Sequence, residues 1–510
     1  MAGIGIKLNR VYRHRSLGMH LYGFAYSAVV TVAPVFVVIG AIVVSQIILH
    51  FETIDYSSRE LFADTMLYTF IFALLFTSPL NAVLSKYISD IIYEEKYDDI
   101  IPCFHFGMGV TVVLGALFGI PFCLREFFVG GVPAYYVFTG YCCFTALMLV
   151  FYTMLYLSIT KNYVRLSLFF VIGMAATVLT VLLWSIFRFP FHMETTYALL
   201  LAMTIGFTLI AALEIALVKS FFRKNSGTWK PVLKHMKKYW RMILINSLYT
   251  LGLYVHNFVF WTTDLRNVLV NTFVTCMPYD MATCLAMFTN ISATIIFIVN
   301  IELHFRDRYR HYFEAVIGGR RHDIKNARLR MFRQLSSELM TLIRLQFIIT
   351  SAIFLICMIL LPQIGLGGLT MRIYPCLCVG YFALFLMYSE ILFLYYFNDE
   401  NGALLTVSVF FLVTLVGSIF SSHLPEIWYG LGVTLGSVSG YSVAFFRLRW
   451  MNRHIDREVF CRGTLIPQGD GVMPTPVVYS KDFSAGNDNE NKTNSKEKAP
   501  SNIKEEANGK

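Results

Sequence analysis

The sequence predicts an all-α polytopic membrane protein with about twelve transmembrane helices in two six-helix bundles. The chain has 510 residues, of which 56% are hydrophobic and only 15% are charged, and its mean hydropathy is +0.59. A soluble domain is roughly a quarter charged. The apolar residues also gather in stretches of about 20 residues, the length that crosses a bilayer as a helix. Such a chain needs a membrane around it.

The predicted spans are taken in chain order. The first six are 24–49, 62–83, 101–124, 134–158, 166–187 and 196–218, and the last six are 242–263, 282–303, 345–361, 375–397, 403–421 and 427–446. The first span is too long for the apolar region of a signal peptide. The basic segment 219–241 falls at the midpoint, which predicts an N-terminal bundle over 1–218 and a C-terminal bundle over 242–447.

The distribution of basic residues predicts that both termini lie in the cytoplasm. Lys and Arg gather in every second connection, most densely in 219–241 and 306–344. The connections on the other side hold almost one each: Arg59, Arg125, Arg188, Arg266 and Arg372. Cytoplasmic loops carry an excess of Lys and Arg. The tail 448–510 is then cytoplasmic, and its polar composition predicts disorder from about residue 468.

A weak internal repeat supports two parallel halves. Residues 86–90 and 96–100 follow the second span, and residues 304–307 and 320–324 follow the eighth. Both places have an aromatic residue and an Asp at the helix end, then a basic residue, an Asp and an Ile. Parallel halves occur in transporters. Inner loops that simply collect the same residue types explain the likeness equally well.

Two inner segments are amphipathic. Apolar residues step by three or four positions in 324–342, and in 229–240 apolar residues and lysines are interleaved. Such helices lie in the headgroup layer of an anionic leaflet, which is the interpretation we favour, or they dock a cytosolic partner. The basic candidates for docking are Lys230, Lys234, Lys237, Lys238, Arg320, Arg321, Arg328 and Arg333.

Enzyme and metal motifs are absent from the sequence. It contains no GxxxxGK[ST], no HExxH and no paired CxxC, so we expect no catalytic residues, metal or cofactor. Cys376 and Cys378 lie in an apolar run, which favours packing, whereas Cys276 and Cys284 flank the start of the eighth span and leave a disulfide open. The net charge of +10 sits at the ends of apolar segments, so it indicates a membrane rather than nucleic acid.

Ionisable residues inside the spans are the candidates for a transport pathway or for ion coupling, because burying them in a bilayer is costly. They are Glu214, His256, Glu302 and Glu390, with Asn257 beside His256. The three glutamates all lie in the cytoplasmic half of even-numbered spans, so they could line one inward-facing vestibule. Three of them have a structural alternative: Glu302 could pair with Arg306 one turn along, Glu214 could pair with Lys219, and His256 could be a hydrogen-bonded core histidine. Glu390 lies deeper in its span and is less easily explained in this way.

Several motifs resemble the PelG family of exopolysaccharide transporters, within the multidrug/oligosaccharidyl-lipid/polysaccharide exporter superfamily. They are the opening residues 1–6, residues 86–90, the ordered pattern Tyr279-Asp280, Ile301-Glu302, Tyr309, Tyr312, Gly318-Gly319 and Ile324, and the closing residues 395–399 and 429–432. The likeness covers about residues 1–460. The chain departs from the family at Glu400-Asn401, where a basic residue is expected after the Asp. The resemblance adds Asp280 to the candidate site residues.

The resemblance implies an exporter that alternates access to a central cavity in the bacterial cytoplasmic membrane. The cargo would be a growing hexosamine-rich polysaccharide made by a cytosolic, PelF-like glycosyltransferase, with PelD-like and PelE-like membrane partners. We expect Glu302→Ala to reduce secretion without loss of membrane insertion. A lipid-linked oligosaccharide flippase and a cation-coupled drug antiporter remain alternatives. A polytopic glycosyltransferase or polymerase is disfavoured because the predicted outer loops are short.

Overall fold

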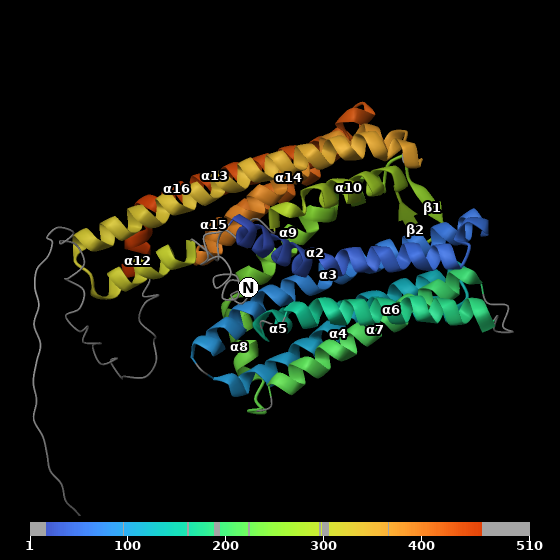
Figure 1. Ribbon diagram of the computed structural model, residues 1–510, viewed down its shortest axis with the longest axis horizontal. Coiled ribbons are helices and arrows are strands. Elements are labelled where there is room, and N and C mark those ends of the chain that lie inside the picture. Colours follow the sequence, from blue (N-terminus) through green and yellow to red (C-terminus); the bar gives the residue numbers. More distant parts are fainter. Residues whose placement is uncertain are drawn as a thin grey trace, which may run out of the picture. The chain divides into compact units, whose positions relative to one another are not determined.

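The computed structural model describes residues 17–461, except 95, 161–162, 188–193, 223–224, 295–296, 298–304 and 366. In this part of the chain the architecture is almost entirely helical (Figure 1). The helices of the first half are α2 (Leu17–Ile48), α3 (Tyr56–Tyr93), α4 (Ile100–Phe128), α5 (Ala134–Thr160), α6 (Tyr163–Phe187) and α7 (Thr195–Phe221). Each of them covers one of the first six predicted spans to within one residue.

The helices of the second half overlap the last six predicted spans. They are α9 (Trp240–Phe260), α10 (Met277–Asn290), α13 (Arg321–Leu360), α14 (Leu369–Tyr396), α15 (Glu400–Ser421) and α16 (Leu431–Cys461). The shorter elements are the helices α8 (Lys230–Lys238) and α12 (Arg306–Gly318) and the 3-10 turns Phe51–Thr53, Tyr97–Asp99, Pro362–Ile364 and Glu426–Trp428. The later part of the predicted span 282–303 lies largely outside the described residues.

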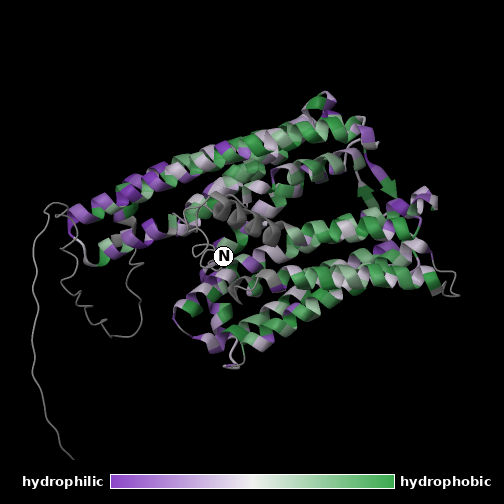
Figure 2. Cartoon of the chain, in the orientation of Figure 1, coloured by the Kyte–Doolittle hydropathy of each residue, from purple (hydrophilic) through white to green (hydrophobic). Residues whose placement is uncertain are grey.

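An all-α polytopic membrane fold is therefore confirmed. Among the described residues, nine helices are long and apolar enough to cross a bilayer. Figure 2 shows hydrophobic residues along most of these helices and hydrophilic ones on α12 and the first part of α13. The total of twelve spans remains a prediction, as do the bundle limits, the orientation and the disordered tail, which lies outside the described residues.

Most helix contacts lie within one half of the chain. In the first half α5 packs against α3, α4 and α7, and α6 packs against α2 and α7, while in the second half α9 packs against α15 and α10 against α14. Helix α3 makes the main contact between the halves, because it packs along α9 and touches both strands of the hairpin described next. Close packing relies on small residues: a Cβ atom on Gly173 of α6 would come within 2.8 Å of the Gly206 carbonyl oxygen of α7.

A β-hairpin between α9 and α10 departs from the all-helical prediction. Strands β1 (Asn267–Leu269) and β2 (Phe273–Thr275) pair antiparallel, with Val268 opposite Val274. The chain turns at Val270 and Asn271, whose φ angles are 52° and 54°. Asn adopts the left-handed region readily, but Val does so rarely. A strand of three residues is too short to show the alternation of apolar and polar residues, and Val is not a residue that predicts a turn. The hairpin therefore cannot be predicted from the sequence.

Helix α13 corrects the interpretation of 324–342 as a separate helix in the headgroup layer. One unbroken helix of 40 residues runs from Arg321 to Leu360 and contains both the amphipathic segment and the ninth span. At about 1.5 Å per residue it is about 60 Å long, roughly twice the hydrocarbon thickness. The amphipathic segment therefore extends away from the span. Its apolar stripe is covered from within the protein: Met331, Leu335 and Leu342 are buried, and α12 packs against α13.

Candidate functional site

The inner ends of four helices enclose a polar cavity, which we call the vestibule. Its volume is about 480 Å³. Inner and outer here follow the orientation predicted from the basic residues. The lining residues come from α3, α9, α14, α15 and the turn between α14 and α15. The polar ones are Ser78, Asn81, Ser85, Lys86, Ser89, Asn246, Tyr249, Tyr388, Tyr395, Asn398 and Glu400. Among these polar residues hydroxyl, amide and phenol groups are the most frequent, with one basic and one acidic side chain, and apolar residues such as Leu74, Ile245 and Val407 complete the lining.

Contacts between the helices hold these side chains in place. The Asn246 amide donates a hydrogen bond to the Tyr395 hydroxyl at 3.1 Å, and the rings of Tyr249 and Tyr388 lie 5.1 Å apart. Lys86 forms an ion pair with Asp90 one turn along, at 3.0 Å. These contacts fix an amide, three phenol rings and an ammonium group around one space, an arrangement suited to a neutral polar ligand with flat apolar faces.

The outer ends of the two halves are joined by an aromatic and hydrogen-bonded contact, which we call the outer seal. The Tyr68 ring of α3 stacks on Trp261 with centroids 5.2 Å apart and an interplanar angle of 4°. The Tyr68 hydroxyl donates to the Val274 carbonyl at 2.9 Å and accepts from its N–H at 3.1 Å. Phe273 packs edge-on against the same ring at 5.1 Å.

A further hydrogen-bonded contact of the outer seal lies at the end of the hairpin. The Asn267 amide donates to Glu60 Oε1 at 2.7 Å, and the Tyr56 hydroxyl donates to the same oxygen at 2.5 Å. Deeper, the Thr250 hydroxyl donates to the Ser78 hydroxyl at 2.9 Å, so α9 and α3 also meet beside the vestibule. The halves are joined at their outer ends and leave space between them at their inner ends.

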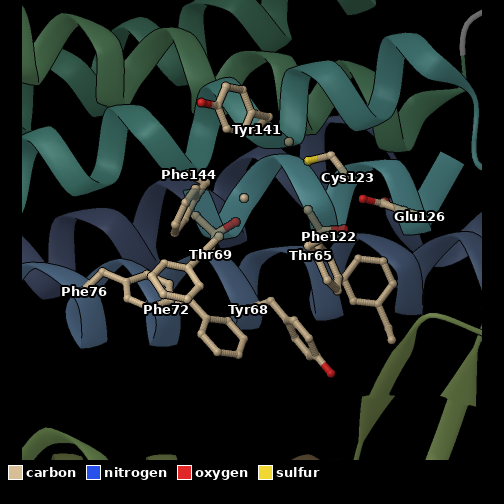
Figure 3. Close-up of a pocket in the computed structure, with 14 residues that line it drawn as sticks. Thr65, Tyr68, Thr69, Phe72, Phe76, Phe122, Cys123, Glu126, Tyr141 and Phe144 are labelled. Carbon is tan, nitrogen blue, oxygen red and sulfur yellow. The ribbon is translucent and has the colours of Figure 1, made fainter. Parts of the chain in front are cut away.

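A smaller cavity of about 210 Å³ lies in the first half, beside the outer seal (Figure 3). Its walls are aromatic residues of α3, α4 and α5 with Phe273 of the hairpin, and its few polar groups include Thr65, Thr69 and Glu126. Tyr68 belongs both to these walls and to the outer seal. The cavity is therefore closed in part by residues that join the two halves.

Two of the predicted site residues meet near the outer seal. The Asn257 amide donates to Asp280 Oδ1 at 2.6 Å, and the Trp261 ring N–H donates to the same carboxylate at 2.9 and 3.1 Å. The Cys276 backbone N–H adds a bond of 3.0 Å. Asp280 thus connects the N-terminus of α10 to Trp261 of the outer seal. Cys276 and Cys284 are both free thiols, so the disulfide left open by the sequence is not formed.

His256 is buried and hydrogen-bonded on both sides. Its Nδ1 lies 2.9 Å from the Tyr279 hydroxyl and its Nε2 lies 3.3 Å from the Tyr381 hydroxyl. This geometry is that of a core histidine, the alternative kept open by the sequence.

Two of the three predicted glutamates, Glu214 and Glu390, do not line the vestibule, which corrects that part of the prediction. Glu214 is buried between α7 and α5, where Thr153 donates a hydrogen bond to it, and Glu390 is buried on α14. Neither lines the vestibule. Helix geometry explains why Glu390 does not line the vestibule. The lining residues Tyr388, Ile391 and Tyr395 share one face of α14, and position 390 is turned by about 100° from position 391. Within the described part of the chain, neither Glu390 oxygen has a hydrogen-bond partner.

The other predicted residues are placed only in part. Glu302 lies outside the described residues, and Arg306 begins α12 with its side chain not described. Of the basic docking candidates, Arg328 is half-buried. The exposed ones are Lys230, Lys234, Lys237, Lys238, Arg320, Arg321 and Arg333.

The lining of the vestibule was not predicted because most of its polar residues are uncharged and all of them are scattered along the sequence. The sequence nevertheless holds a signal: Ser78, Asn81, Ser85 and Ser89 recur at steps of three or four along α3, from the end of the second predicted span into the residues that follow it. Such a polar stripe on an otherwise apolar helix marks a face that avoids lipid.

A multi-pass bundle of apolar helices with a polar vestibule between its halves defines a membrane transporter. The chain belongs to the protein family described as "PelG: Putative exopolysaccharide Exporter (EPS-E)", which it matches over residues 1–460. The protein is thus a multi-pass protein of the bacterial cytoplasmic membrane, in an exporter family. No curated protein sequence matches the chain.

Solved structures confirm the transporter fold. The chain is similar to a mutant of the Vibrio cholerae MATE transporter VcmN, with a TM-score of 0.60 and 11% identity over 88% of this chain and 98% of that one. A MOP superfamily transporter from Pyrococcus furiosus gives 0.59 and 11%, over 85% and 96%. An outward-facing multidrug resistance MATE family transporter of the MOP superfamily gives 0.58 and 14%, over 85% and 96%. At these identities the likeness shows the fold alone.

Proposed function

We propose that this protein exports a hexosamine-rich exopolysaccharide across the cytoplasmic membrane for a biofilm matrix, and that the polymer enters through the vestibule. The observation that carries the proposal is the vestibule's chemistry, in a chain that belongs to an exopolysaccharide exporter family. Sugar rings present hydroxyl and amide groups at their edges and apolar faces. The amide of Asn246 and the rings of Tyr249 and Tyr388 complement both kinds of surface.

The outer seal supports an alternating-access mechanism. With Tyr68 and Trp261 stacked, the halves are held together on the outer side while the vestibule lies at the inner ends. Export then requires the hydrogen bonds at Val274 and Asn267 to break as the vestibule closes. The seal is small enough for reversible opening, since each hydrogen bond contributes only about 0.5–1.5 kcal/mol net.

The membrane-embedded ionisable residues take a coupling role in this proposal. Glu390, without a hydrogen-bond partner among the described residues, and Glu214, with one free oxygen there, are suited to binding a proton or cation. Glu302 stays a pathway candidate because it is an ionisable residue in a predicted span, and Arg306 stays a candidate beside it, one turn along. Asp280 and Asn257 serve the outer seal through Trp261, and His256 braces α9 against α10 and α14.

Partners follow from the same proposal. A cytosolic, PelF-like glycosyltransferase would synthesise the polymer and deliver it to the vestibule, with PelD-like and PelE-like membrane partners completing the assembly. The exposed Arg320, Arg321 and Arg333 at the start of α13 lie on the part of the helix that extends beyond its span. They offer a cationic surface for docking.

A second candidate function is a lipid-linked oligosaccharide flippase or cation-coupled drug antiporter of the same superfamily. The buried carboxyl groups of Glu214 and Glu390 favour it, because ion-coupled transporters of any substrate use such groups. The chemistry of the vestibule favours the sugar polymer over an apolar cationic drug.

A gene deletion tests the proposal. Extracellular hexosamine polymer is measured in the deletion strain with and without a plasmid copy, at matched levels of the cytosolic transferase. Export by this chain predicts loss of secreted polymer and its restoration by the plasmid. Unchanged polymer would overturn the proposal, and drug resistance and undecaprenyl-linked sugar measured in the same strains would then identify the second candidate.

A further inference from the structure

Helix α8 presents three different faces. Val232 is fully buried, and His235 packs between Tyr87 and Tyr239 with ring centroids 5.0 and 4.4 Å away. This first face holds α8 against the inner end of α3. The second face is apolar and partly exposed, and the third consists of exposed lysines.

The apolar face consists of Trp229 and Leu233, four residues apart and therefore one above the other on the helix. Trp229 is 51% exposed although its ring stacks on Phe106, and Leu233 is 37% exposed. Trp240, which begins α9 directly after α8, is 54% exposed. Two indole rings at the end of a bundle of membrane spans match the aromatic belts that sit at bilayer interfaces.

The lysine face lies beside the apolar one. At about 100° per residue, Lys230 and Lys237 fall next to the Trp229–Leu233 face, and Lys234 and Lys238 follow further round. All four are exposed, and no acidic residue lies between Lys219 and Arg241. The position of α8 is set by its neighbours, because α7 ends at Phe221 and α9 begins at Trp240, both at the predicted cytoplasmic surface.

We propose that α8 is a binding site for anionic phospholipid headgroups of the cytoplasmic leaflet. Trp229 and Leu233 enter the boundary between headgroups and acyl chains, and the four lysines bind phosphate groups beside them. Charge complementarity with the lysine face selects anionic headgroups, and the aromatic apolar face selects a bilayer over a free anion. The inference is independent of which substrate the protein transports.

The site is linked to the vestibule. The ammonium group of Lys238 lies over the Tyr239 ring at 5.2 Å, and Lys86, which lines the vestibule, lies over the same ring at 5.8 Å. Lipid bound to α8 therefore acts beside the inner opening and at the start of α9. Anionic lipid at this site holds the linker between the halves in a fixed position.

Quenching of tryptophan fluorescence tests the proposal. The full chain is reconstituted in phosphatidylcholine vesicles holding a fraction of doxyl-labelled phosphatidylglycerol or of doxyl-labelled phosphatidylcholine. The signal of Trp229 and Trp240 is the difference between the unchanged chain and a W229F/W240F variant, which leaves Trp261 of the outer seal in place. We expect labelled phosphatidylglycerol to quench this signal roughly twofold more than labelled phosphatidylcholine.

Charge variants separate this site from general attraction. K230Q/K234Q/K237Q/K238Q should abolish the preference for phosphatidylglycerol, whereas R320Q/R321Q/R330Q/R333Q removes the same charge from α13 and should retain it. Equal quenching by the two labelled lipids in the unchanged chain would overturn the proposal. Absence of quenching by either would also overturn it and would assign α8 to a cytosolic protein partner.

Discussion

Tyr68 of α3 lies face to face with Trp261 at the end of α9, with ring centroids 5.2 Å apart and an interplanar angle of 4°. The two residues are far apart in sequence and belong to different halves of the chain. Trp261 is itself fixed by Asp280, which accepts hydrogen bonds from its ring N–H. The stack therefore connects three helices at the outer end of the bundle and closes the side opposite the vestibule.

Locking the outer seal should stop export. Glu60 and Asn267 are hydrogen-bonded at 2.7 Å, so an E60C/N267C pair is within reach of a short bifunctional thiol reagent. We expect crosslinked cells to lose polymer secretion, because the seal can no longer open, and a reductant that cleaves the reagent to restore it. E60C and N267C alone, treated in the same way, control for the other cysteines. Normal secretion with the pair fully crosslinked would rule out this seal as a gate.

Glu390 should affect transport more than stability. Its carboxyl group is fully buried without a hydrogen-bond partner among the described residues, so Glu390→Gln keeps the shape and removes a titratable group. We expect an unchanged melting temperature in detergent and about tenfold less secreted polymer, equivalent to roughly 1.4 kcal/mol on the transport barrier. Wild-type secretion by this variant would leave Glu390 with a packing role only.

Asp399 should be essential for stability. It is 1% exposed, accepts bonds from Arg447 Nε at 2.5 Å and Nη2 at 3.0 Å, and accepts from the Gly402 N–H at 3.1 Å, which caps α15. Removing one partner of a buried ion pair costs about 3–5 kcal/mol, and part of Arg447 is exposed, so we expect about 2–3 kcal/mol for Asp399→Ala. Thermal unfolding in detergent measures the loss. Glu400→Ala, at the next position and half-buried, is the matched control, and an equal loss in both variants would contradict this role.

The packing of α8 against α3 should weaken in acid. Burial lowers the pKa of His235 from 6.5 to about 4, with Lys86 and Lys238 acting in the same direction and Asp90 against it. The folded protein then binds fewer protons than the unfolded chain between these values, so stability is fully present above about pH 6.5 and falls toward about pH 4. Hydrogen exchange across 230–238 should rise over this interval, and His235→Gln should remove that rise. A pH-independent exchange rate in the unchanged chain would contradict the prediction.

The sequence predicts the helices well because each one is an apolar run of spanning length, which forms a helix in a membrane whatever its neighbours. The hairpin at 267–275 escapes prediction because its strands are short and its turn places Val270 in a left-handed conformation. The lining of the vestibule is not predicted for another reason. Asn246 and Tyr395 lie on different helices, and only tertiary packing brings them together. Glu390 does not line that space. The sequence could not show this, because the rotation of a helix about its axis cannot be assigned without the neighbouring helices.

If the polymer passes through the vestibule, a substitution that fills part of this cavity should block export. Ala82 lines the vestibule, whereas Ala212 on α7 is exposed on the outside of the helices. Secreted polymer is measured in a deletion strain carrying Ala82→Trp or Ala212→Trp at equal amounts in the membrane. We predict that Ala82→Trp abolishes secretion while Ala212→Trp supports it normally. Normal secretion by Ala82→Trp would contradict passage through the vestibule, because the indole ring occupies part of the space that the sugar chain has to cross.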